Sequence, residues 1–147
     1  MKQKEFEKFY QELLHKITEE EAAQYSPIVL DEYHHPKNFG TLDHPSATGT
    51  VKGPCGDTMS IQLRVNENII TQEAFWTDGC GASIACGSML TQLIHNQTIE
   101  QANQISSKHL QLSLGGLPEE HIHCTELAIN TLHCCFESLK EKTRNHL

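Results

Sequence analysis

The stretch MSIQLRVNENIITQEAFW, at positions 59–76, decides the fold class of this 147-residue chain. Its second half, Ile69–Trp76, follows a turn at Asn66–Asn68 and is rich in β-branched and aromatic residues. Its first half alternates apolar and polar residues, which is typical of a β-strand with one buried face. The apolar members are Met59, Ile61, Leu63 and Val65. The stretch therefore predicts an antiparallel β-hairpin.

Helical signals lie on both sides of this hairpin. A Ser-Pro pair favours a helix over residues 27–35, and the proline at position 36 ends it. Apolar residues at helical spacing run over residues 84–94 and again over residues 127–139. Between these two helices, Thr98 and Gln101 form a capping box for a shorter one.

The order of these elements predicts an α+β fold. We expect a small antiparallel sheet of about three strands packed against helices, with N-terminal helices and a long C-terminal helix. An amphipathic stripe from Phe6 to Ile17 predicts a further helix within residues 1–24, which we assign as an N-terminal helical extension. Residues 25–147 then form a single domain.

Composition and charge exclude several functional classes. Eleven basic residues against nineteen acidic ones give a net charge of −8, which argues against nucleic acid as a partner. No segment approaches the length of a membrane span, so no membrane partner is expected. The first residues show neither a secretory signal nor a transit peptide, and we expect a cytoplasmic protein. In a reducing compartment the six cysteines serve metals or catalysis more often than disulfides.

Three cysteines that lie far apart along the chain stand in polar or glycine-rich segments. Cys55 precedes a Gly-Asp pair that ends at Asp57, Cys80 lies between two glycines, and His123 precedes Cys124. The hairpin would bring the first two thiols to one end of the sheet, because one precedes its first strand and the other follows its second. A helix that begins beside Cys80 or Cys124 would lower the pKa of that thiol.

These residues predict a metal or cluster site that exists only in the folded chain. The candidate ligands are Cys55, Asp57, Cys80, His123 and Cys124. A single Cys-x-Asp turn or His-Cys pair is weak evidence for a metal site. The prediction rests on the three motifs together. Two alternatives stay open: a zinc-stabilised binding module, and a thiol enzyme in which one of these cysteines uses a histidine as base.

The other three cysteines lie on predicted helices. Cys86 and Cys135 fall on apolar stripes, so we expect both to be small core residues. Cys134 is expected to be partly exposed. None of the three is expected to bind the metal.

In these motifs the chain resembles the U-type iron–sulfur cluster assembly scaffolds, the NifU N-terminal domain and IscU-like family. The resemblance runs from Tyr25 to the end of the last helix. Cys55, Cys80 and Cys124 match the three cluster-ligand cysteines of the family. Two further positions match as well: the aspartate of the Cys-Gly-Asp motif, and the histidine before the third cysteine.

The resemblance implies a scaffold, not an enzyme. Such a protein builds a labile [2Fe-2S] cluster from iron and from sulfur that a cysteine desulfurase supplies, and transfers it to apo iron–sulfur acceptor proteins. An iron donor is a further implied partner, and zinc can occupy the site in the isolated protein. Asp57, His123 or a group from outside the chain supplies the fourth ligand. The alternative is a zinc-binding sulfur-transfer protein of the SufU type, whose insertion between Cys80 and Cys124 is missing here.

The chain also departs from the family pattern. Residues 117–121 read LPEEH where IscU-type members carry a Leu-Pro-Pro-Val-Lys segment that recruits a DnaK-type chaperone. We therefore expect no dedicated docking of that chaperone. His121 stands in place of the usual lysine, and Cys86 adds a thiol where the family commonly has a small residue.

Overall fold

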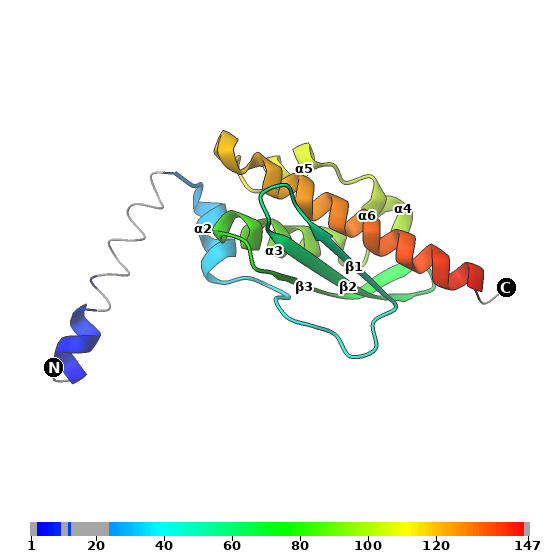
Figure 1. Cartoon of the computed structure of the whole chain (residues 1–147), viewed down its shortest axis with the longest axis horizontal. Helices are drawn as coiled ribbons and strands as arrows, with labels where there is room; N and C mark the ends of the chain where they lie inside the picture. Colours follow the sequence, from blue (N-terminus) through cyan, green and yellow to red (C-terminus); the bar gives the residue numbers. More distant parts are fainter. Residues whose placement is uncertain (1–2, 10–11, 13–23, 146–147) are drawn as a thin grey trace.

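A computed structural model describes residues 3–9, 12 and 24–145 of the chain. Residues 3–9 are helical, and Phe6 and Phe9 on this segment are both exposed. The rest of the predicted apolar stripe up to Ile17 lies outside the described residues. The three strands form one sheet, and helices lie before and after it in the chain (Figure 1), which confirms the α+β prediction.

The predicted hairpin forms strands β2 (Thr58–Asn66) and β3 (Ile69–Thr77), which pair antiparallel. Glu67 and Asn68 turn the chain between them with positive φ angles of 51° and 67°, the conformation that a tight hairpin turn requires. The third strand, β1 (Ala47–Lys52), pairs antiparallel with β2 and completes the order β1-β2-β3. The sequence pattern indicated a third strand but did not give its bounds.

Local capping determines where several helices begin. Helix α2 (Pro27–His34) begins after Ser26, whose hydroxyl accepts a hydrogen bond from the Val29 amide at 3.1 Å. Helix α4 (Ile99–Asn103) has the capping box that the sequence predicts. Helix α5 (Ser107–Ser113) was not expected from the sequence, because Leu110 is its only buried residue and no apolar stripe marks it.

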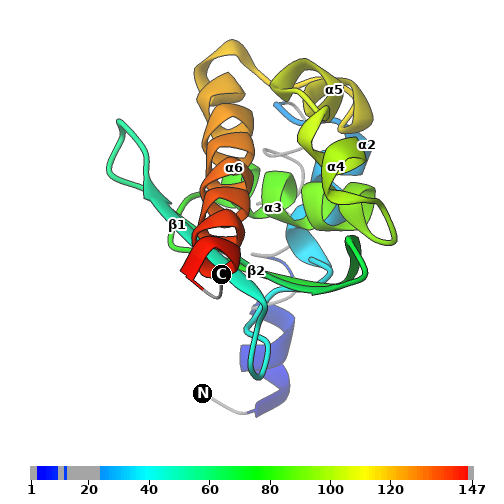
Figure 2. The ribbon, with the colours of Figure 1, turned by 90° about the vertical axis from the view of Figure 1, so that its right-hand side faces the viewer.

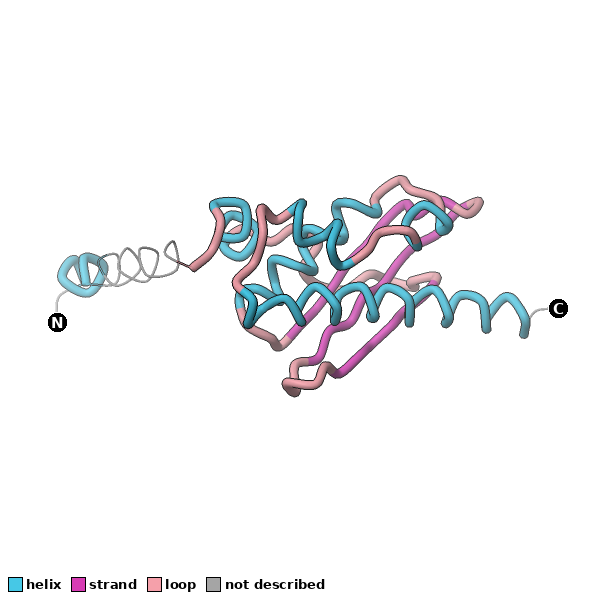
Figure 3. The backbone as a smooth tube through the Cα atoms, turned by 90° about the horizontal axis from the view of Figure 1, so that it is seen from above, coloured by secondary structure: helices cyan, strands magenta, loops and turns pink. Residues whose placement is uncertain are grey.

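Two helices cover one face of the sheet. Helix α3 (Gly81–Ile94) lies against β3, and helix α6 (Ile122–Asn145) lies against β1 and crosses the strands obliquely (Figures 2 and 3). A short 3₁₀ turn, η1 (Glu119–His121), leads directly into α6. The core between the layers is apolar and fully buried. It includes Met59, Ile61, Leu63, Phe75, Leu90, Ile94 and Leu132.

The arrangement gathers three chain segments at one end of the sheet. The loop between β1 and β2, the junction between β3 and α3, and the start of α6 all lie there. Hydrogen bonds tie the first two segments together, because Thr58 donates its amide to Asp78 Oδ1 at 2.7 Å. Among the described residues, no helix is both long and apolar enough to cross a membrane.

Candidate metal centre

The backbone presents Cys80 at the start of a helix. Cys80 is the N-cap of α3, with extended φ and ψ of −71° and 179°, and its thiol is exposed. Glycine is needed on its C-terminal side, because a Cβ at Gly81 would lie 2.6 Å from the Tyr33 ring. The flanking glycine therefore lets α2 pack close to the first turn of α3.

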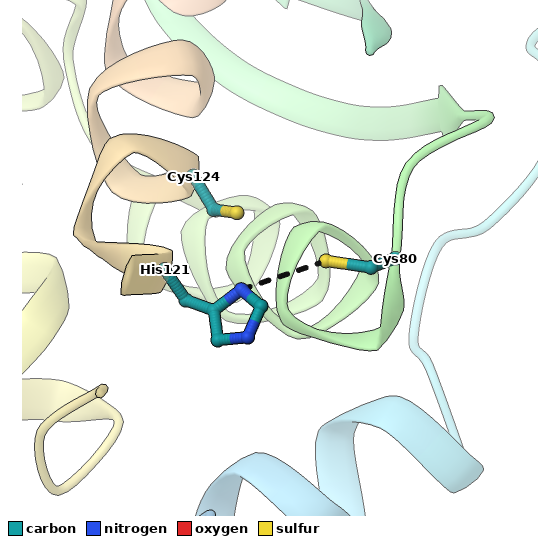
Figure 4. A group of neighbouring side chains, drawn as sticks. All are labelled: Cys80, His121 and Cys124. Carbon is teal, nitrogen blue, oxygen red and sulfur yellow. Dashed lines mark hydrogen bonds between the residues drawn. The ribbon is translucent and has the colours of Figure 1, made fainter. Parts of the chain in front are cut away.

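Three side chains converge beside this helix start (Figure 4). One ligand atom from each of Cys80, His121 and Cys124 lies within 4.8 Å of the other two. His121 Nδ1 lies 3.9 Å from the exposed sulfur, Cys80 Sγ. Because the three residues come from α3, η1 and α6, the group exists only in the folded chain.

The two sulfurs of this group shift each other's pKa in opposite directions. The Cys124 thiol hydrogen-bonds to Cys80 and, with the amides of Ser83 and Ala82 in the first turn of α3, lowers the pKa of Cys80 to about 4. The same hydrogen bond and burial raise the pKa of Cys124. The expectation of a lowered thiol pKa at a helix start is confirmed for Cys80. It is wrong for Cys124, because that thiol is buried beside an existing thiolate.

Neighbouring polar groups hold the remaining members in place. Ser83 Oγ donates to Cys124 Sγ at 3.4 Å. The Tyr25 hydroxyl lies 3.1 Å from His121 Nε2, and the two rings are 5.6 Å apart between centroids. These contacts fix the second ring nitrogen of His121 and leave Nδ1 facing Cys80, as partners of metal-binding histidines commonly do.

The other predicted ligands surround this group without belonging to it. Cys55 is exposed in the loop between β1 and β2, at the same end of the sheet as Cys80, as the hairpin predicts. Asp57, in the same loop, reaches the junction before α3, where its Oδ2 lies 3.0 Å from the position of a Cβ at Gly79. His123 Nε2 lies 3.7 Å from Cys124 Sγ.

His121 is the member that the sequence did not identify as a ligand. It was noted only as a replacement for the usual lysine. Its position three residues before Cys124 is a usable signal, because residues at i and i+3 share one helix face. Adjacent helical residues point about 100° apart, which explains why His123 lies outside the three-residue group.

The donor set fits a borderline or soft metal. Thiolate and imidazole are the ligands that zinc and iron–sulfur centres use. One thiol of the group is exposed, the imidazole is half-buried and the other thiol is buried, so the site has an open side. The loop that carries Cys55 and Asp57 lies at this end of the sheet and offers further donors.

The remaining cysteines occupy the places that the sequence predicts. Cys86 and Cys135 are buried in the core, and burial raises the pKa of both thiols, to about 12 for Cys135. Cys135 Sγ faces the Ile61 carbonyl at 3.6 Å. Cys134 is partly exposed.

Comparison with known proteins identifies relatives of one kind, NifU-like and IscU proteins. The model of the NifU-like N-terminal domain matches residues 24–146. The iron–sulfur cluster assembly scaffold protein IscU of Azotobacter vinelandii is 38% identical over 123 residues, which cover 80% of this chain and 95% of that protein. The scaffold protein IscU 1 of Archaeoglobus fulgidus is 40% identical over 109 residues, covering 74% of this chain and 71% of that protein.

A solved structure supports the fold. The N-terminal part of a NifU-like protein from Brucella abortus superposes with a TM-score of 0.63 and covers 80% of this chain and 94% of its own. Its sequence is 19% identical, so this likeness shows the fold alone. The family match and the relatives confirm the resemblance that the cysteine motifs indicated. The chain belongs to the NifU-like N-terminal domain family.

Proposed function

We propose that this chain is a scaffold on which an iron–sulfur cluster is assembled and from which the cluster passes to acceptor proteins. The observation that carries the proposal is the meeting of Cys80, His121 and Cys124 within 4.8 Å at an open end of the sheet. Relatives that cover most of the chain are named as scaffold proteins for this assembly. The cluster is then cargo, and the chain acts as a carrier that catalyses no reaction of its own.

The cysteine thiolates are the main ligands in this proposal. A [2Fe-2S] cluster takes four ligands, and Cys55, Cys80 and Cys124 supply three of them. The fourth position falls to a harder donor beside the thiols. Asp57 and His123 are the donors expected from the sequence, and the geometry adds His121 as a third.

A harder fourth donor explains how the cluster can leave. A carboxylate oxygen or an imidazole nitrogen binds sulfide-bridged iron less firmly than a thiolate does. An acceptor cysteine therefore displaces this ligand first, while the three thiolates still hold the cluster. The open side of the site gives the incoming cysteine access.

The proposal names the partners by the chemistry that they supply. A cysteine desulfurase provides sulfur at the oxidation level of a persulfide, and a two-electron reductant converts it to sulfide. A separate donor provides iron, and apo iron–sulfur proteins accept the finished cluster. Zinc fits the same thiolate and imidazole donors in the isolated protein. No observation favours the zinc-binding sulfur-transfer alternative over assembly.

Anaerobic reconstitution tests the proposal. The chain is incubated with ferrous iron, L-cysteine, a cysteine desulfurase and a thiol reductant, and then with an apo-ferredoxin. We expect the visible absorbance of a [2Fe-2S] cluster, followed by its appearance on the ferredoxin. A Cys86→Ala variant serves as the matched control and retains cluster formation. A folded chain with reduced thiols that yields no cluster absorbance would contradict the proposal.

A further inference from the structure

A carboxylate and an imidazole contact each other far from the cysteine group. Glu73 is on β3, and His95 is the C-cap residue of α3. His95 Nδ1 and Glu73 Oε1 are 2.8 Å apart. Helix α3 begins at the cysteine end and has 14 residues, so about 21 Å of helix separates the two places.

The carboxylate of this pair is buried and only partly satisfied. The Glu73 side chain is 6% exposed, and its Oε2 has no hydrogen-bond partner among the residues that the structure describes. Burial raises the pKa of Glu73, although the nearby His95 opposes the shift. An unpaired carboxylate oxygen in a buried position is costly, and a cation bound to the same carboxylate lowers the cost of its buried charge.

There is space beside the Glu73–His95 pair. Two hollows of about 300 Å³ and about 370 Å³ are both lined by Asn38, Glu73 and His95. The backbone of Asn38 and Phe39 runs along the outer edge of β3, where the Asn38 carbonyl accepts from the Phe75 amide at 2.9 Å. The hollows therefore lie between this edge segment, β3 and the end of α3.

The local charge favours a cation. The C-terminal end of a helix carries partial negative charge, and α3 ends beside the hollow at Ile94. Lys37 also lines one hollow, but its ammonium group is already paired with Asp31 and Glu32 at 3.4 and 3.3 Å. These two carboxylates therefore compensate the charge of Lys37.

We propose that Glu73 and His95 form a binding site for a divalent transition-metal ion, separate from the cysteine centre. Carboxylate oxygen and imidazole nitrogen lie about 2.0–2.2 Å from such an ion, so two ligands at right angles in an octahedral shell are about 3 Å apart. The observed 2.8 Å between Oε1 and Nδ1 is close to that separation. Water completes the coordination.

Cobalt(II) is a suitable probe because its paramagnetism broadens the NMR signals of nearby groups. The full-length chain is used with Cys55→Ser, Cys80→Ser and Cys124→Ser, so that the thiols at the other end do not compete. We expect one saturable binding event by calorimetry, with His95 ring signals broadened first. Where these substitutions disturb the native spectrum, the wild-type chain preloaded with one equivalent of zinc replaces them.

Glu73→Gln keeps the shape of the side chain but removes its charge. We expect it, and His95→Gln, to weaken cobalt binding at least about ten-fold, since even losing a partner of a metal ligand has an effect of that size. His109→Gln changes an exposed histidine on α5 and should leave binding unchanged. Absence of saturable binding in the folded chain would overturn the proposal, as would equal affinity in the Glu73→Gln variant. Neither result bears on cluster assembly at the cysteine end.

Discussion

The end of the sheet and the core beneath it both contain cysteines, and the two regions give the thiol opposite properties. Cys80 is exposed at the first turn of α3, where hydrogen bonding from Cys124 and backbone amides lowers its pKa to about 4. Cys86 lies on the same helix, fully buried, and burial raises its pKa. Position in the fold, more than residue type, therefore decides which thiols are available to a metal.

Substitution of the two kinds of cysteine gives the largest expected contrast. Cys80→Ser and Cys124→Ser each remove a sulfur ligand from the converging group, so we expect loss of stable cluster formation in reconstitution. Cys86→Ala should form the cluster in normal yield. Visible absorbance and iron content measure the outcome. Loss of the cluster in a folded Cys86→Ala variant would remove the distinction between the regions.

Alkylation compares the thiols directly. At pH 7 we expect iodoacetamide to modify Cys80 on the order of a hundred-fold faster than Cys86, because only the former is both exposed and a thiolate. The thiolate exists above its pKa, so the rate should stay nearly constant from about pH 8 to pH 6 and fall only as the pH approaches about 4. Peptide mass spectrometry of timed samples measures both rates. A steep fall between pH 8 and pH 7 would show that Cys80 is an ordinary thiol.

The histidines permit a finer test of the same comparison. His121→Ala removes the imidazole nearest to Cys80, and we expect zinc to be lost about ten-fold more readily to a chelator. His133→Ala, an exposed position further along α6, is the control and should behave like the wild type. Competition with a chromophoric chelator measures the affinity. Equal retention in the two variants would exclude His121 from the site.

Asp57→Cys gives the smallest expected effect. A fourth thiolate would replace a harder donor, so we expect cluster transfer to an apo-ferredoxin to slow by a few-fold, since a stronger iron–sulfur bond must break. The rate at which the ferredoxin spectrum appears measures the rate of cluster transfer. Asp57→Asn keeps the size of the side chain and removes only the carboxylate charge. It therefore distinguishes the effect of the added thiolate from the effect of the lost charge. Unchanged transfer by the Cys variant would count against Asp57 as the exchangeable ligand.

Local sequence patterns accounted for most of the fold. The hairpin was predictable because alternation and turn residues act over short distances. The bounds of β1 were not, because this strand contains Gly49, where a Cβ would collide with the backbone of Cys135 on α6. The strand needs a glycine there because it packs against a helix that is distant in sequence. A local sequence pattern cannot predict such a contact.

Some residues of the candidate site could likewise be predicted from local sequence patterns, and others could not. Cys80 and Cys124 were predictable from short motifs, and the hairpin correctly placed Cys55 at their end of the sheet. The choice between histidines was not predictable from adjacency, because His123 precedes the third cysteine but His121 approaches Cys80. That choice depends on the join between η1 and α6, which the sequence did not indicate.

X-ray absorption at the zinc edge, on the chain loaded with one equivalent of zinc, tests the convergence of these side chains most directly. We predict at least two sulfur scatterers and one imidazole, with the imidazole contribution lost in His121→Ala and retained in His123→Ala. A coordination shell of oxygen and nitrogen alone, or one that is identical in His121→Ala, would contradict the account.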